Sequence, residues 1–454
     1  MCQKIMCFFV FGLLLPPVKG NSQKIWTLDN CIAYALEHNL TQETQNYDAI
    51  ISKERWRQSK RDMLPTINVS YPSYNVSFGR TLDPVTNSFV ETRFVSGISG
   101  GLSSSITLFE SFKKWHTLTY QKLIYKSSQY DVQQAQYDLV FKIMDLFNQV
   151  VFHEGALKIV KEQQVSNILQ HKTISKKVDL QLLAKADLYD MEATVSADAL
   201  AVLRAENTLK ASKLALIQEM NLNVDTINIV QEITEDTPSF KNASFATDQL
   251  FRTSNDILPS LQISKLNVEQ AKKRLAITKT ALFPTIRLGA GLNTRYSVNL
   301  KDAFGTTIPF KDQIKNNQSK YYGLSFSFPV FNNGRIRSNI KISKIDLEKA
   351  QIQLEIEEQH IYKIIQELLQ KNEALIAEEQ LNLKNVRAKE KAYNIAKKKY
   401  EKQLINLYEL QLASSTYLAA KIEQIRLTVQ IAIQKRTLNF YNGTFLLPTK
   451  GITN

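Results

Sequence analysis

Glu357 and His360 are the residues whose types and spacing come nearest to a catalytic motif. A Glu-x-x-His pair on a helix supplies part of the ligand set of a di-iron carboxylate bundle, which needs a second such pair on a facing helix. No second pair occurs near His116, His153 or His171. We therefore interpret His360 as a solvated helix residue and expect no metal site. A di-iron enzyme stays a distant hypothesis that metal analysis would test.

Other motifs for catalysis or cofactor binding are missing from the sequence. It has no Gly-rich phosphate loop, no Cys-x-x-Cys pair and no Ser/His/Asp motif. The net charge of +14 and the lysine-rich segment RAKEKAYNIAKKKYEKQ could indicate nucleic-acid binding. That segment, however, carries Ile395 and Ala396 at helical spacing, and its basic residues are mixed with Glu and Gln, which is typical of a solvated helix face. We predict no enzyme, no cofactor and no nucleic-acid partner.

The N-terminal residues have the pattern of a secretory signal peptide. A single lysine precedes an apolar run at 5–15, and residues 18–20 place small side chains at the −3 and −1 positions of a cleavage site. We expect residues 1–20 to be removed, although a short buried first helix is the alternative. Removal would leave Cys31 alone, so no intrachain disulfide is expected. Beyond the signal no apolar stretch reaches about eighteen residues, so a membrane-spanning part would have to consist of strands.

Long helices account for most of the remaining sequence. Only 14 Gly and 11 Pro interrupt 454 residues that are rich in Gln, Lys, Glu, Leu and Ile. The longest predicted helix, residues 334–400, would be about 100 Å long, several times the diameter of an ordinary domain. One apolar stripe repeats every seven residues from Ile340 to Leu375, and another, with Ile342 and Ile356, lies on a different side. Two stripes imply two neighbouring helices, as in a wall of helices.

Two pairs of predicted strands interrupt these helices. We expect strands at about 66–80 and 93–109, and again at about 285–298 and 320–331. Apolar residues alternate with small or polar residues in each strand, and the phase slips at Pro72, as a bulge would allow. Such alternation gives each strand one apolar face and one small, polar face.

The two strand faces predict two different surroundings. In a transmembrane barrel the apolar face would meet lipid, and the polar face would line the lumen. The expected lipid-facing residues are Leu288, Leu324, Phe326 and Phe328, and the expected lumen-facing residues are Arg287, Arg295 and Ser325. Four strands cannot close a barrel, which needs about eight, so several copies would have to combine. The alternative is an antiparallel sheet whose apolar face packs on a soluble helical core.

The same order of elements occurs twice along the chain. Pro65 and Pro284 each stand where a helix gives way to a strand, and they are 284 − 65 = 219 residues apart. Each half reads helix, two strands, long helix, turn, helix. We expect a first repeat at 21–222, a linker at 223–245, a second repeat at 246–442 and a C-terminal tail at 443–454.

This doubled order resembles the TolC-like outer-membrane efflux protein family. The Leu-Pro and Phe-Pro starts of the strands and the segments TLDNCIAYALEHN and LINLYELQLASSTYLAAK carry the resemblance, which covers nearly the whole mature chain. It implies a mainly α protein with a transmembrane β-barrel portion. Three chains would form a homotrimer whose twelve strands make one barrel, joined to a long α-helical barrel. The location implied is the cell outer membrane of a Gram-negative type of cell, in contact with outer-membrane lipid and with a long periplasmic extension.

The resemblance also implies a function and partners. The protein would be the outer-membrane channel of a tripartite efflux pump or a type I secretion system, a passive conduit for small molecules or polypeptides. Its partners would be a periplasmic adaptor (membrane fusion) protein and an inner-membrane transporter of the RND or ABC class. The alternative is a periplasmic coiled-coil adaptor or scaffold protein that never enters a membrane. Fractionation separates the two, because only the channel would need detergent for its release.

Residues at two helix-to-helix turns acquire roles through this resemblance. Tyr400 is similar to a residue of the closed periplasmic tip, and Glu409 to one acidic ring at its entrance. Leu412 stands where family members often carry a second acidic residue, so we do not expect strong cation selectivity. The turns that would dock the adaptor contain Gln181, Leu182, Leu183, Asp187, Gln403, Leu404 and Ile405.

Gln181 and Gln403 stand where the family often has glycine, and they are 403 − 181 = 222 residues apart. Glycine adopts positive φ without steric cost, whereas another residue there costs on the order of 1 kcal/mol. One hypothesis is that the bulky amides hinder the adaptor. The alternative is that both turns use another backbone geometry.

Overall fold

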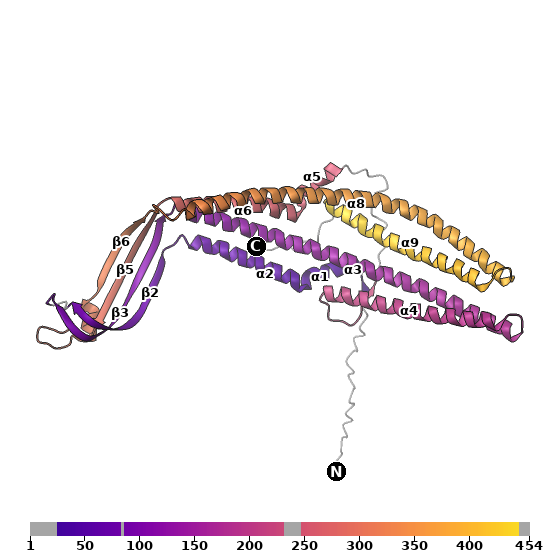
Figure 1. The fold of residues 1–454 in the computed structure, drawn as a ribbon, viewed down its shortest axis with the longest axis horizontal. Coiled ribbons are helices and arrows are strands. Elements are labelled where there is room, and N and C mark those ends of the chain that lie inside the picture. Colours follow the sequence, from indigo (N-terminus) through magenta and orange to yellow (C-terminus); the bar gives the residue numbers. More distant parts are fainter. Residues whose placement is uncertain (1–24, 83–85, 231–246, 445–454) are drawn as a thin grey trace, which may run out of the picture.

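The structure, a computed structural model, describes residues 25–82, 86–230 and 247–444. The expected signal peptide lies outside these ranges, as do most of the expected linker and tail. Figure 1 shows an elongated molecule with a sheet at one end and two helical hairpin tips at the other. Among the described helices, none is both long enough and apolar enough to cross a membrane.

The principal elements follow the same order in both halves. The first half contains β1 (Ile25–Trp26), α1 (Leu28–His38), α2 (Leu40–Arg61), β2 (Thr66–Leu82), β3 (Phe89–Phe109), α3 (Lys113–Asp179) and α4 (Lys185–Glu219). The second half contains β4 (Asn228–Ile229), α5 (Thr247–Ile257), α6 (Pro259–Lys279), the short helix η2 (Thr280–Leu282), β5 (Thr285–Ser297), α7 (Phe310–Asn316), β6 (Ser319–Ser327), α8 (Arg335–Glu401) and α9 (Leu407–Tyr441).

The long helices of the two halves have equal lengths and equal spacing along the chain. Helices α3 and α8 each have 67 residues, and α4 and α9 each have 35. Their starts are separated by the same interval, 335 − 113 = 222 and 407 − 185 = 222. Left-handed backbone recurs at that interval too, in the pairs Ser111 and Asn333, Phe112 and Gly334, Gln181 and Gln403, and Asn221 and Gly443. The two halves therefore share backbone geometry even though three of these four pairs differ in residue type.

The helical segment before the first long strand consists of two helices, α1 and α2. Thr27 does cap the start of α1, since its side chain accepts a hydrogen bond from the Asn30 backbone N–H at 3.3 Å. The helix breaks at Asn39, whose side chain caps α2 by accepting from the Gln42 backbone N–H at 3.1 Å. The Asn39 amide also donates to the Glu219 carbonyl at 2.8 Å, which ties the break to the end of α4.

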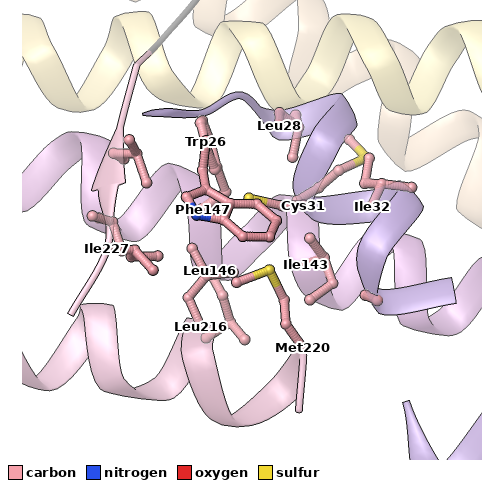
Figure 2. Close-up of a cluster of buried hydrophobic side chains, with 14 of the residues drawn as sticks. Trp26, Leu28, Cys31, Ile32, Ile143, Leu146, Phe147, Leu216, Met220 and Ile227 are labelled. Atoms are coloured by element: carbon pink, nitrogen blue, oxygen red, sulfur yellow. The ribbon is translucent and has the colours of Figure 1, made fainter. Parts of the chain in front are cut away.

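A buried apolar cluster joins the two ends of the first half to the middle of α3 (Figure 2). Trp26 and Cys31 come from the start of the described chain, Ile143 and Phe147 from α3, and Met220 from the residue that ends α4. A second cluster joins α5, α6, α8 and α9 in the second half. Tyr137 and Phe141 of α3 meet Phe440 of α9 edge to face, so the two clusters hold the halves together.

The helices form a row whose members change along the length of the molecule. Nearer the sheet, α2 contacts α3, α3 contacts α6, and α6 contacts α8. Towards the tips, α3 contacts α4 and α9, and α9 contacts α8. Helix α8 buries Ile361, Ile365 and Leu375, whereas Ile342 and Ile356 stay exposed. The first of its two predicted stripes thus has partners within the described chain, and the second has none there.

The sheet has the order β2-β3-β5-β6, and all its neighbours are antiparallel. The register shifts between Ser70 and Ser73, so the bulge predicted at Pro72 is confirmed. The expected strand at 320–331 ends earlier, because β6 stops at Ser327 and leaves Phe328 outside the sheet. Pro329 follows, and a proline has no backbone N–H to continue the pairing.

Candidate functional site

The apolar face of the sheet is open to the surroundings. Cross-strand pairing puts Leu288 beside Leu324, and Phe326 follows on the same face. Leu324 and Phe326 are 66% and 67% exposed, and Leu288 and Phe328 are also exposed. The sheet projects beyond the long helices in Figure 1. The helix that packs on it among the described residues is the short α7, which contacts β5. The alternative of a sheet buried against a helical core is therefore wrong.

The opposite face of the sheet is small and polar. Arg287 pairs with Thr107 on β3 and with Ser325 on β6, and the Ser325 hydroxyl donates to the Arg287 carbonyl at 3.3 Å. Arg295 pairs with Ser99. The structure thus separates the predicted lipid-facing residues of β5 and β6 from the predicted lumen-facing residues, while Phe328 lies past the strand end. Which face meets lipid stays a prediction.

Exposed aromatic side chains surround the place where the strands join the helices. They are Phe109, Phe112, Trp115, Phe283, Phe328 and Phe331. Phe112 has a left-handed backbone with φ 62° directly before α3, and its ring meets that of Phe109. Trp115, whose indole is amphipathic, and the basic residues Lys113 and Arg335 are of the types that occur where lipid meets water, whereas the phenylalanine rings are apolar throughout.

The first helix-to-helix turn is a Schellman motif with glutamine at its left-handed position. Gln181 has φ 59°. Its backbone N–H donates to the Val178 carbonyl at 2.9 Å, and the Leu182 N–H donates to the Lys177 carbonyl at 2.8 Å. This pair of bonds satisfies the last carbonyls of α3 and normally selects glycine at the left-handed position.

The second turn repeats this geometry. Gln403 has φ 60°. Its N–H donates to the Tyr400 carbonyl and the Leu404 N–H to the Lys399 carbonyl, both at 2.9 Å. The hypothesis that the two turns avoid left-handed backbone is therefore wrong. Leu182 and Leu404, at equivalent positions, are 60% and 69% exposed, so each tip presents an apolar side chain.

The helices that follow the two turns begin differently. Asn406 caps α9, because its side chain accepts from the Glu409 backbone N–H at 2.9 Å. Ala184 stands at the equivalent place before α4 and has no side chain that can cap. Asp187 and Glu409 both lie in a first helical turn, where a negative charge stabilises the helix end. The Asn-x-x-Glu spacing at 406–409 is a capping signal that sequence reasoning missed.

Tyr400 connects the two hairpins near their tips. It packs with Leu183 against a cluster in which Ile174, Met191 and Leu407 are buried. Its hydroxyl is buried and has no hydrogen-bond partner among the described residues. Burial, and secondarily the Asp187 carboxylate, raise the pKa of the Tyr400 phenol, so the ring is neutral at physiological pH.

Other predicted tip residues lie apart from this cluster. Glu409 is exposed, and Ile405 is half-buried in the turn. A cross-hairpin bond that the sequence did not suggest joins the Gln411 amide of α9 to the Thr194 hydroxyl of α4. Glu357 is half-buried and His360 exposed on α8. Within the described ranges, no three His, Cys, Asp or Glu side chains gather closely enough to hold a metal ion.

The chain combines long paired helices with a sheet that has two open faces. Residues 257–444 match the family model described as outer membrane efflux protein. A search of curated proteins finds no match. The resemblance to TolC-like proteins is confirmed by this match and by the fold.

Several solved outer-membrane channels have the same fold. CusC superposes with a TM-score of 0.77 at 15% identity, covering 91% of each chain. CmeC of Campylobacter jejuni has a TM-score of 0.77 at 17% identity, covering 93% of this chain and 87% of its own. VceC of Vibrio cholerae has a TM-score of 0.74 at 14% identity, covering 92% of this chain and 96% of its own. At such identities the likeness shows the fold alone.

Proposed function

We propose that three copies of this chain form a passive exit duct through the outer membrane. The observation that carries the proposal is a four-stranded sheet with both faces exposed, at the end of helices about 100 Å long. An isolated sheet of this kind leaves apolar side chains and two strand edges unsatisfied. Lipid and further copies of the chain would satisfy both.

The strand order supports closure between copies. Strands β2 and β6 are the two edges, and strand direction alternates across the sheet. Strand β6 of one copy would therefore run antiparallel to β2 of the next, whatever the number of copies. Three copies give twelve strands, which exceeds the minimum of about eight for a closed barrel.

Exposed apolar residues on the outer helices support the same arrangement. Helices α2 and α8 end the row near the sheet. The exposed apolar residues of α2 include Tyr47, Ile50 and Ile51, and those of α8 include Ile342, Ile345, Ile352 and Ile356. Contact between α8 of one copy and α2 of the next would bury both groups, and would continue the helical row into a tube.

The mass of the detergent-solubilised particle tests this proposal. After correction for bound detergent, we expect about three protomers, recovered from outer-membrane material. A well-behaved monomer that inserts into bilayers would contradict the trimer. Release of the protein in soluble form would instead favour the periplasmic adaptor or scaffold.

The two tips would contact the rest of an export system. Leu182, Leu183, Leu404 and Ile405 would dock a periplasmic adaptor, and Tyr400 and Glu409 would line the entrance that opens for export. The exposure of Leu182 and Leu404 and the contacts of Tyr400 across both hairpins support these roles. Asp187 would contribute negative charge at the same end.

The inner-membrane partner would be a transporter of the RND or ABC class, serving a tripartite pump or a type I secretion system. A wide water-filled duct selects cargo weakly, so the transporter would determine the substrate. Purification from native membranes without disruption of the complex identifies the partner. Recovery with no adaptor and no transporter, under conditions that preserve such complexes, would contradict the coupling.

A further inference from the structure

The connection between β5 and β6 lies at the end of the sheet that is remote from the long helices (Figure 1), because β5 begins shortly after η2 and β6 ends shortly before α8. It spans 319 − 297 − 1 = 21 residues, whereas the equivalent connection between β2 and β3 spans 89 − 82 − 1 = 6. The longer connection contains α7. Two antiparallel strands can be joined by a short turn, so pairing of the strands does not account for the additional residues.

Helix α7 folds back over the apolar face of the sheet. The Thr294 hydroxyl donates to the Ile314 carbonyl at 2.9 Å, and the rings of Tyr296 and Phe310 meet with centroids 5.1 Å apart. Thr294 and Tyr296 lie on the same side of β5 as Leu288, since strand residues separated by an even number share a face. The connection therefore covers the far end of the face that the proposed duct turns towards lipid.

A buried glutamine fixes α7 in this position. Gln313 is 1% exposed, and its side-chain nitrogen donates to the Ser297 carbonyl at 2.9 Å and to the Ile308 carbonyl at 2.7 Å. Its side-chain oxygen accepts from the Ser297 backbone N–H at 2.9 Å. Lys311 and Lys315 lie about 160° around the helix from Gln313. With Gln313 held against the strand end, both lysines face outward, and both are exposed.

A third lysine lies on the apolar face of the sheet itself. Lys320 of β6 pairs with Leu292 of β5, and Tyr322, two residues further along the same face, is 90% exposed. Phe310 of α7 is 51% exposed. A lysine on an apolar face is stable where its ammonium group reaches water or an anion. Lys320 thus marks the level at which the apolar face gives way to polar surroundings.

The positive charges of this region are unpaired. Within the described ranges, Lys311, Lys315 and Lys320 form no ion pair. Of the two carboxylates at 298–320, that of Asp302 accepts hydrogen bonds from two backbone N–H groups of its own turn, both at 2.9 Å, and Asp312 is exposed. The far end of the sheet therefore presents excess positive charge directly beside exposed aromatic rings.

We propose that Lys311 and Lys315 of α7, with Lys320 of β6, bind the phosphate groups of a lipid in the outer leaflet. This inference rests on the proposed position of the sheet in the outer membrane. The rings of Phe310 and Tyr322 lie against the acyl chains, while the lysines reach the headgroup phosphates as point charges. A soluble acidic partner would not require the lysines to be continuous with an apolar face. The bound lipid holds the sheet at a fixed depth.

Native mass spectrometry of the detergent-solubilised full chain tests the site. The probes are lipid A, a glycolipid with two phosphates, and its dephosphorylated form, each titrated at constant ionic strength. We expect the parent to bind the dephosphorylated form at least about tenfold more weakly than lipid A. The variant Lys311→Gln/Lys315→Gln/Lys320→Gln should bind lipid A about 100-fold more weakly than the parent, because each lysine near an anionic surface contributes about fivefold.

The matched control is Lys384→Gln/Lys391→Gln/Lys398→Gln, which removes three exposed lysines of α8 and should bind lipid A as the parent does. Four results would overturn the site: no binding of lipid A, equal binding of both lipids by the parent, parent affinity in the variant of the sheet end, or an equal loss in the control. If the triple variant does not assemble, Lys315→Gln alone decides the matter. It should bind lipid A about fivefold more weakly, and unchanged affinity would refute the proposal.

The mass of the same particles tests the duct separately from the lipid site. Trimers that bind both lipids alike would refute the lipid site and leave the duct intact. A monomer that is released without detergent would refute both, since the site depends on a membrane position.

Discussion

Replacing Gln181 and Gln403 with glycine should stabilise both tips. Each glutamine occupies the left-handed position of a Schellman motif, with φ 59° and 60°. A non-glycine residue in that region costs about 1–2 kcal/mol, and glycine carries about 0.5–1 kcal/mol of extra unfolded-state entropy. The difference leaves a gain of about 0.5–1 kcal/mol per turn, or about 1–2 kcal/mol for both turns of a chain.

Amide hydrogen exchange measures this gain where it arises. The reporters are the amides of residues 181, 182, 403 and 404, because their hydrogen bonds close the two motifs. A gain of about 0.5–1 kcal/mol should slow their exchange by about two- to fivefold. Gln380→Gly is the matched control, since Gln380 is exposed in the interior of α8. There the same substitution should speed local exchange, because glycine costs about 1 kcal/mol within a helix.

Exchange that is unchanged or faster at both tips would refute the argument from left-handed strain. The same variant tests the functional hypothesis that the amides hinder the adaptor. In that case adaptor affinity and drug export should both rise above those of the parent. If slower exchange is found without a rise in either, the strain is real and the hindrance is not.

Three further predictions concern the sheet and the tips. Phe326→Lys should impair trimer assembly, because a charge facing the middle of the lipid costs about 2–4 kcal/mol. Ser325→Lys should mainly change single-channel conductance. Equal effects of the two variants would show that the faces are misassigned. Ala184→Asn should stabilise the start of α4, and Asn406→Ala should destabilise the start of α9, each by about 1 kcal/mol, as measured by amide exchange in the first helical turns. If the two variants do not change the exchange rates in opposite directions, capping is not the difference between the tips. Tyr400→Phe removes a buried hydroxyl that has no hydrogen-bond partner among the described residues, and it should stabilise the closed tip. Lower basal conductance would reveal this stabilisation. Higher conductance would mean that the hydroxyl bonds a neighbouring copy.

Periodicity in the sequence predicted the parts of the fold that depend on repeated patterns. Alternation located the strands and their faces, and the slip at Pro72 located a bulge, because side-chain period and phase are local properties of a strand. The break at Asn39 was not predicted, since the reason for it lies in the Glu219 carbonyl, far away in the sequence. The early end of β6 was missed although Pro329 offered a signal.

The tips show the same limit for the candidate site. Leu182 and Leu404 could be placed at the turns from the repeat, because both turns stand at equivalent positions. Contact between Tyr400 and the cluster around Met191 depends on how two hairpins pack, and no local pattern encodes it. The bond between Gln411 and Thr194 is of the same kind, since it joins residues of α9 and α4.

The equal lengths of the paired helices limit how the protein can change in size. Inserting one residue in α3 would turn everything beyond it by about 100° and move its tip by about 1.5 Å, so that buried side chains would face outward. Seven residues make nearly two full turns and preserve the buried side, but they lengthen a helix by about 10 Å. Longer helical hairpins would therefore require matched insertions in α3, α4, α8 and α9 together, because a change in one hairpin alone would leave the two tips at different distances from the sheet.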